Sequence, residues 1–131
     1  MVIIQHTFTL NDFVLKVQLY AEIKKKLCYY ANQKYSSNVI EKVFDEEMVC
    51  DEMIQCVLQG NNFELMMLDN YGNYVAQKVL CKASEDDKHV LYNKIVTLIP
   101  RLQLLPYGQK LLSKLLIQYP KLAMIMLHVS Q

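Results

Sequence analysis

The stretch YSSNVIEK at residues 35–42 recurs in altered form as YGNYVAQK at 71–78 and as YGQKLLSK at 107–114. The copies are 36 residues apart, because 71 − 35 = 36 and 107 − 71 = 36. The first tyrosine, the branched apolar residue at the fifth position and the final lysine recur in all three copies. A fixed period of 20–50 residues is typical of stacked repeats, which present a long concave binding face. The sequence therefore predicts a repeat array with a binding surface.

The composition favours helices that are joined by short connections. Of the 131 residues, 53% are hydrophobic and 21% are charged, whereas glycine and proline number three each. Such a chain is able to bury a core and contains few helix breakers. We expect Ser36 or Ser37 to cap one helix and Ser84 to cap another. The apolar spacing predicts helices over 11–26, 27–34, 36–44, 45 to the turn at 60–62, 63–68, 71–81, 84–100, 102–105, 107–118 and 120–128.

The composition also limits the classes of function. The net charge of +1 neither requires nor excludes a nucleic-acid partner, because a single-strand reader needs less basic excess than a binder of long duplexes. No apolar run reaches the roughly 18 residues of a membrane span, and the first ten residues lack the pattern of a signal peptide. No Ser-His-Asp set, Cys-His pair or Gly-rich phosphate loop is present, so we do not expect an enzyme.

The cysteines and methionines are interpreted as structural residues. The cysteines lack C-x-x-C pairing and a histidine at zinc spacing, so we expect free, mostly buried thiols in a reducing, cytoplasmic compartment, without a metal or other cofactor. We expect the methionines in the middle of the chain to lie in the core. These residues are Cys28, Cys50, Cys56 and Cys81, and Met48, Met53, Met66 and Met67.

Two polar pairs lie four residues apart within the repeated stretch, Ser37 with Glu41 and Asn73 with Gln77. Residues at i and i+4 share one face of a helix. A carboxylate offers only hydrogen-bond acceptors, which match the N1–H and N2–H donors of guanine. A side-chain amide offers one acceptor oxygen and an NH₂ donor, which suit N3–H and O4 of uracil. Asn73 is then able to donate to uracil O2. Each pair taken alone is better explained as a cap or a solvated surface, whereas the common register of the two pairs favours base reading.

Other side chains of the repeated stretch have two possible roles. Asn38 and Tyr74 project between the paired residues, and Tyr74 is the better candidate for stacking on a base. Lys42 and Lys78 directly follow the pairs and either contact phosphates or form surface ion pairs. We expect the recurring tyrosines Tyr35, Tyr71 and Tyr107 to pack at the helix starts rather than to stack on bases.

The repeated segments resemble the RNA-reading helices of Pumilio repeats, the PUF family, and the resemblance covers essentially the whole chain. SSNVIEK and GNYVAQK are similar to the last two base-reading repeats, PYGQKLLSKL to the degenerate C-terminal capping repeat, and MVIIQH to half of a further reading helix. The resemblance implies an all-α, right-handed superhelical solenoid of three-helix repeats, an α-α superhelix. It would comprise a partial repeat over 1–25, repeats over 26–60 and 61–98, and a capping repeat over 99–131.

The resemblance also implies sequence-specific binding of single-stranded RNA. Ser37, Asn38 and Glu41 would read G, and Asn73, Tyr74 and Gln77 would read U. Gln5 suggests a further U and hence a 5′-UGU element, although Met1 and Val2 stand where the family has the partners of Gln5. The degenerate repeat carries Gln109, Lys110 and Ser113, which are not a recognised base code. Such proteins act on 3′ untranslated regions in translational repression or mRNA decay, with repressors or deadenylation factors as partners.

Two alternative functions remain open at this stage. The chain is also consistent with a nucleolar PUF-like protein that binds nucleic acid without the base code. A protein-interaction solenoid would use the convex face or the Gly60–Asn62 loop. Because Met1–Ile4 stand inside a repeat, we expect an open apolar N-terminal end, with self-association or marginal stability, and the chain is readable as a fragment of a longer protein.

Overall fold

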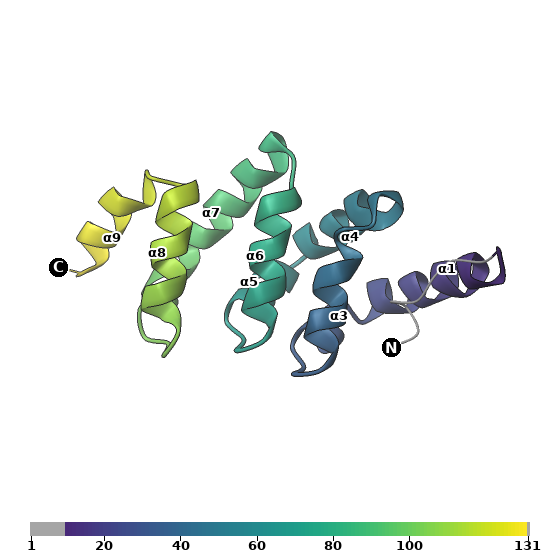
Figure 1. Cartoon of the computed structure of the whole chain (residues 1–131). Helices are drawn as coiled ribbons and strands as arrows, with labels where there is room; N and C mark the ends of the chain where they lie inside the picture. The colour runs from purple at the N-terminus through teal and green to yellow at the C-terminus, as the bar shows by residue number, and fades with distance from the viewer. Residues whose placement is uncertain (1–9, 131) are drawn as a thin grey trace. The chain divides into compact units, whose positions relative to one another are not determined.

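A computed structural model describes residues 10–130, and all regular structure within that range is helical (Figure 1). The chain divides into two compact units between Ala83 and Ser84. No described helix is both long enough and apolar enough to cross a membrane. The helices are α1 (Leu10–Lys25), α2 (Leu27–Ala31), α3 (Ser36–Val43), α4 (Glu47–Leu58), α5 (Asn62–Met67), α6 (Gly72–Lys82), α7 (Glu85–Leu102), α8 (Gly108–Gln118) and α9 (Leu122–Ser130).

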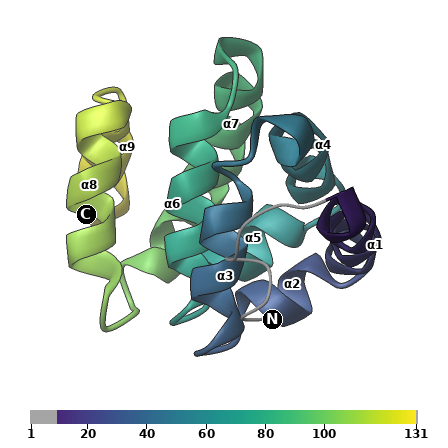
Figure 2. The ribbon, with the colours of Figure 1, turned by 45° about the vertical axis from the view of Figure 1, so that its right-hand side comes forward.

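In the first unit, equivalent helices of successive repeats lie against one another. Helix α1 contacts α4, α2 contacts α5, and α3 contacts α6, and Figures 1 and 2 show α3 and α6 side by side. Their apolar faces bury a continuous core, as expected of stacked repeats. The prediction of a methionine-containing core is confirmed for Met53, Met66 and Met67, which are fully buried, whereas the side chain of Met48 lies outside the described ones.

The first residue of α3, α6 and α8 packs against the carbonyl group six residues before it. In α3 this residue is Ser36, whose Oγ donates to the Tyr30 carbonyl oxygen at 2.5 Å. A Cβ added to Gly72 would lie 2.8 Å from the equivalent carbonyl oxygen, and one added to Gly108 would lie 1.6 Å from it. The period therefore repeats a close backbone contact, and this contact explains the small residue at the start of each helix.

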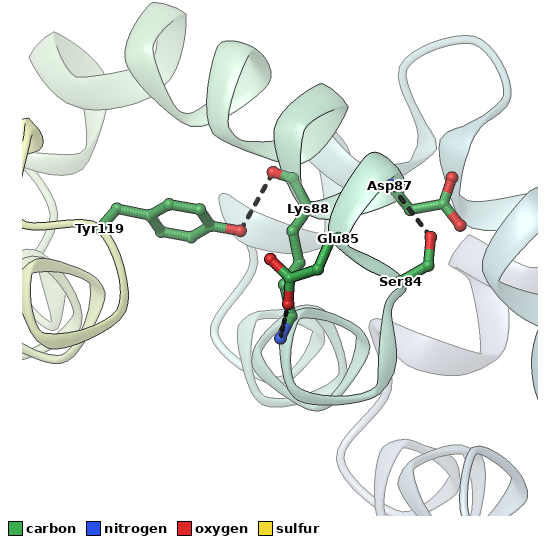
Figure 3. A network of polar contacts seen from close by, with 5 residues as sticks. All are labelled: Ser84, Glu85, Asp87, Lys88 and Tyr119. Atoms are coloured by element: carbon green, nitrogen blue, oxygen red, sulfur yellow. Dashed lines mark hydrogen bonds and ion pairs between the residues drawn. The ribbon is translucent and has the colours of Figure 1, made fainter.

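In the second unit, α7, α8 and α9 pack against one another. Ser84 Oγ accepts a hydrogen bond from the Asp87 backbone N–H at 3.1 Å, which confirms the predicted cap. The Tyr119 hydroxyl donates to the Lys88 carbonyl oxygen at 3.2 Å and ties the end of α8 to the first turns of α7 (Figure 3). Burial raises the pKa of Tyr119 to about 12, so the hydroxyl keeps its proton, and with it this hydrogen bond, at neutral pH.

Ser84→Ala should destabilise the protein by about 1 kcal/mol, because it removes the side-chain acceptor that satisfies the Asp87 N–H group in the first turn of α7. Urea unfolding would measure the change. Ser113→Ala is the matched control, since Ser113 Oγ donates to the Gln109 carbonyl oxygen within an exposed helical turn. Equal losses for the two variants would show that the cap is not the cause.

Two predicted helix boundaries in the second unit are wrong. Helix α7 continues through Pro100 to Leu102, and the predicted helix over 102–105 is a turn. Continuation of the helix places both Ile99 and Leu102 in the core, where neither is accessible to solvent. This burial offsets the backbone hydrogen bond that Pro100 cannot make. Helix α9 begins at Leu122 because the residues at 120–121 form the preceding turn.

The predicted serine cap of α3 is also wrong. Helix α2 ends at Ala31, Tyr35 occupies the N-cap position of α3, and no side chain caps the helix. Ser36 and Ser37 lie inside the helix, where each hydroxyl donates to a backbone carbonyl group of the preceding residues. The hydroxyls therefore satisfy orphan acceptors rather than the orphan N–H groups that a cap would satisfy.

Some predicted burials are wrong as well. Tyr35 does not pack at the helix start, because its side chain is 83% exposed. The four cysteines are free, but Cys81 is exposed and the other three are only half-buried. In α1, apolar side chains remain about half exposed, which is compatible with the predicted self-association without testing it. These side chains are Val14, Leu15 and Val17.

Candidate nucleic-acid interface

Helices α3 and α6 present the predicted reading residues in the same register. Because α3 begins at residue 36 and α6 at residue 72, Ser37 and Asn73 are both second in their helices. Both are buried, at 4% and 3% exposure. The third residues are exposed and the sixth are half-buried, and these are Asn38 and Tyr74, then Glu41 and Gln77. Since the two helices pack together, the structure brings these six residues onto neighbouring turns.

The Asn73 side chain is hydrogen-bonded to the preceding backbone and to the side chain of Gln77. Its Nδ2 donates to the carbonyl oxygens of Asp69 at 2.7 Å and Asn70 at 2.9 Å, and its Oδ1 accepts from Gln77 Nε2 at 3.1 Å. Both amide protons are therefore in use, which differs from the expectation that Asn73 donates to uracil O2. Gln77 retains one acceptor, Oε1, and one amide proton for a ligand.

Ser37 and Glu41 form the equivalent pair on α3. Ser37 Oγ donates to the Lys34 carbonyl oxygen at 3.3 Å, which is the counterpart of the bond from Asn73 to Asn70 one period later. Within residues 10–130, the Glu41 carboxylate accepts no hydrogen bond and forms no ion pair. Burial raises its pKa, the positive charge of Lys78 lowers it, and the negative charge of Asp45 raises it. A half-buried carboxylate of this kind is suited to receive N–H donors from a ligand.

The two lysines that follow the reading residues have different surroundings. Lys78 Nζ lies 2.9 Å from Asp45 Oδ1, and Lys82 Nζ lies 3.1 Å from the same oxygen. Lys42 is exposed and has no acidic partner among the described residues. The surface-pair alternative is therefore observed for Lys78, while a phosphate contact by Lys42 stays a prediction.

Aromatic side chains flank the reading residues. Tyr74 is 52% exposed at the third position of α6 and is thus open to a ligand. Tyr35, which the sequence did not predict to be exposed, has the Lys34 ammonium 5.7 Å from its ring centroid.

Gln5 lies outside the described residues, so its predicted role stays untested. Among residues 10–130, no three His, Cys, Asp or Glu side chains form a group suited to a metal ion.

The second unit contains a pocket of about 380 Å³ that the sequence did not predict. It forms where the first turns of α7 meet the junction of α8 and α9. The Tyr92 and Tyr119 rings lie 5.4 Å apart in its wall, and Glu85 pairs with Lys88 at 3.7 Å beside it (Figure 3). The lining residues are Glu85, Lys88, His89, Tyr92, Gln118, Tyr119, Pro120 and Lys121.

Comparison with known proteins identifies the repeats. The family model for the Pumilio-family RNA binding repeat matches residues 27–54 and 62–96, the segments that contain α3 and α6 with their reading pairs. The chain carries Pumilio-family repeats. Its fold is therefore the all-α repeat solenoid of that family, as the resemblance predicted.

Curated Pumilio proteins of two organisms are similar to these Pumilio repeats. Two Pumilio domain-containing proteins of Schizosaccharomyces pombe are 28% identical over 120 residues and 34% identical over 91 residues, which is 90% and 68% of this chain. Pumilio homolog 12 of Arabidopsis thaliana is 31% identical over 116 residues, or 86% of this chain. The chain spans 18%, 12% and 19% of the lengths of these three relatives.

A solved structure shows the same repeat architecture. The crystal structure of PUF-8 in complex with PBE-RNA superimposes with a TM-score of 0.70 at 28% identity. The match covers 89% of this chain and 34% of the PUF-8 chain. The likeness thus extends over nearly the whole chain.

Proposed function

We propose that the chain binds single-stranded RNA in a sequence-specific manner through α3 and α6, with one base read by each helix. The observation that carries this proposal is the common register of the two polar pairs on helices that pack against each other. The similarity to PUF-8, whose crystal structure contains PBE-RNA, supports it. A Pumilio-type reader of this kind uses side chains on base edges and requires no catalytic group.

On α3, Glu41 is the proposed guanine reader. Its two carboxylate oxygens match the adjacent N1–H and N2–H donors of guanine, and no residue within 10–130 donates a hydrogen bond to either oxygen. Asn38 is exposed beside it and completes the edge of the site. Ser37 is a less direct participant, because its hydroxyl proton is bonded to the backbone.

On α6, Gln77 is the proposed uracil reader. Oε1 accepts from uracil N3–H, and the remaining amide proton of Nε2 donates to a uracil carbonyl oxygen. The exposed ring of Tyr74 stacks on a base, a contact that contributes about 1–3 kcal/mol. With the chain antiparallel to the RNA, α6 takes the 5′ base, so the proposed element is 5′-UG, extended to 5′-UGU if Gln5 reads the next base.

The biological setting belongs to the same proposal. Short UGU-type elements would direct the protein to 3′ untranslated regions of mRNA in the cytoplasm, where it would lower translation or mRNA stability. The chain spans 12–19% of the lengths of the three relatives described above. Repressors or deadenylation factors would be recruited by the assembly that contains these repeats.

Glu41→Gln should shift the preference of the protein from 5′-UGUA toward 5′-UUUA, because it gives α3 the same amide that α6 carries at the equivalent position. A lost edge pair costs about 1–3 kcal/mol, which corresponds to roughly 5-fold to 150-fold in the ratio of the two dissociation constants. Fluorescence anisotropy at low salt with the two labelled RNAs measures that ratio.

Glu47→Gln is the matched control for charge, since Glu47 lies in the exposed first turn of α4. It should leave the ratio unchanged. Equal, salt-sensitive binding of both RNAs by the unmodified protein would indicate a nonspecific basic surface. Absence of binding to either RNA would favour a protein-interaction solenoid instead.

A further inference from the structure

Helix α6 places a charged side chain, that of Lys78, against Asp45 at the end of α3. We propose that Lys78 is a positioning residue for Glu41, so that guanine recognition by one repeat depends on a lysine of the next repeat. The inference rests on the proposed function. Its starting point is an ion pair between the repeats that the 36-residue period does not predict, because its two members, Asp45 and Lys78, are 33 residues apart in the sequence.

The ion pair fixes the Lys78 ammonium next to the end of α3. Lys78 Nζ lies 2.9 Å from Asp45 Oδ1, and Lys82 Nζ holds the same oxygen at 3.1 Å. Asp45 follows α3 directly, and its backbone N–H donates to the Lys42 carbonyl oxygen, so the helical turn continues past Glu41. The Asp45 pKa is lowered by its hydrogen bonds to Lys78 and Lys82, so this anchor stays ionised at neutral pH.

Among the described residues, the charged groups that act on Glu41 are Lys78 and Asp45. Asp45 lies in the same segment as Glu41, and Lys78 lies on the neighbouring α6. Helix α2, which also packs against α3, has the sequence LCYYA; its titratable groups are one thiol and two phenols, and it contains no Asp, Glu, Lys, Arg or His. Burial and Asp45 both disfavour the ionised carboxylate of Glu41, whereas Lys78 favours it.

The ionisation of Glu41 decides which base it is able to bind. An ionised carboxylate offers acceptors to both N1–H and N2–H of guanine. A protonated carboxyl group instead carries an O–H donor, which faces a guanine donor and removes one of the two bonds. The Lys78 charge therefore sustains guanine recognition, while the Asp45 bond keeps that charge in place.

The sign of the pH dependence follows from the raised pKa of Glu41. As the pH falls through this pKa, Glu41 gains a proton and the preference for 5′-UGUA over 5′-UUUA declines. Lys78→Gln removes the favourable charge, so the Glu41 pKa rises and the decline moves to higher pH. Lys78→Arg keeps the charge and should restore the original profile.

The first measurement is the titration of the Glu41 side-chain carboxyl group by NMR in the free protein. Lys78→Gln should shift its midpoint to higher pH. Lys82→Gln is the matched control, because Lys82 shares the Asp45 carboxylate with Lys78 but is not among the groups that act on Glu41. An unchanged midpoint in Lys78→Gln would overturn the inference whatever the protein does with RNA.

The second measurement is the ratio of affinities for 5′-UGUA and 5′-UUUA across pH. Lys78→Gln should lower this ratio at mildly acidic pH, and the effect should vanish in a Glu41→Gln background, which isolates the coupling between the two side chains. If Lys78→Gln weakens both RNAs equally and reduces the salt dependence, Lys78 is a phosphate contact and the inference fails. If the unmodified protein does not distinguish the two RNAs at any pH, the proposed function itself is wrong.

Discussion

Gly108→Ala is expected to lower the free energy of unfolding by about 3 kcal/mol, the upper end of the range for an overpacked site. A Cβ at this position would lie 1.6 Å from the Leu102 carbonyl oxygen and 2.8 Å from the Leu102 carbonyl carbon. Both contacts are to backbone atoms. Leu102 cannot yield easily, because its side chain is fully buried and its backbone forms the end of α7. The helices of the second unit would have to move apart.

The other two glycines provide graded controls. A Cβ on Gly72 would meet the Asn32 side-chain oxygen at 1.9 Å, but that side chain is able to turn away, and the nearest backbone atom is 2.8 Å distant. A Cβ on Gly60 would meet nothing within 4 Å, and the cost there comes only from a φ of +53°, about 1–2 kcal/mol. Urea unfolding should rank the losses as Gly108→Ala, then Gly72→Ala, then Gly60→Ala. Equal losses would show that steric contact does not control these positions.

The sequence predicted the parts of the fold that depend on local or repeated signals. The 36-residue period placed the starts of α3, α6 and α8 within one residue, because the same close contact requires a small residue at each start. Ser84, followed by acidic residues, identified the start of α7, since capping is a local property. The period also set the register of the reading residues.

Features that depend on tertiary contacts were not predictable. Pro100 is a local signal for a helix end, but α7 continues to Leu102, because the continued helix buries the Leu102 side chain. The period indicates that Ser37 and Asn73 are equivalent, yet it does not reveal that both donate to the preceding backbone. The bond between Asp45 and Lys78 joins two different repeats, and such a contact is visible only once the repeats are packed together.

Asn73→Ala is expected to have the second large effect, on both stability and base discrimination. The amide donates to two carbonyl groups in a buried position, and its loss leaves the Asn70 carbonyl oxygen without this donor. A lost hydrogen bond typically costs about 0.5–1.5 kcal/mol, so the two bonds together account for roughly 1–3 kcal/mol. The Asp69 carbonyl oxygen is less affected, because it also accepts the Asn73 backbone N–H. Urea unfolding measures the loss.

Asn73→Ser is the control that the chain itself suggests. Ser37 occupies the equivalent position on α3 and donates to the Lys34 carbonyl oxygen, the equivalent of that of Asn70. A serine at position 73 should therefore keep one donor for the backbone, and the variant should lose less stability than Asn73→Ala. A serine as harmful as an alanine would show that the bond to Asn70 contributes little.

Base discrimination should be lost in both variants, because Asn73 fixes the orientation of the Gln77 amide. The carbonyl oxygens of Asp69 and Asn70 require the NH₂ end of Asn73 to face them, so its Oδ1 is the atom that faces Gln77 and accepts from Nε2. Gln77 Oε1 is then left to accept from uracil N3–H.

Cytosine presents the reverse pattern, an acceptor at N3 and a donor at N4. Without Asn73 Oδ1, the Gln77 amide is free to turn over and match cytosine as well as uracil. The ratio of affinities for 5′-UGUA and 5′-CGUA should therefore approach one in Asn73→Ala and in Asn73→Ser, while the preference for guanine at the next position persists because Glu41 is untouched. A retained preference for uracil in Asn73→Ser would show that Gln77 is oriented by something other than Asn73.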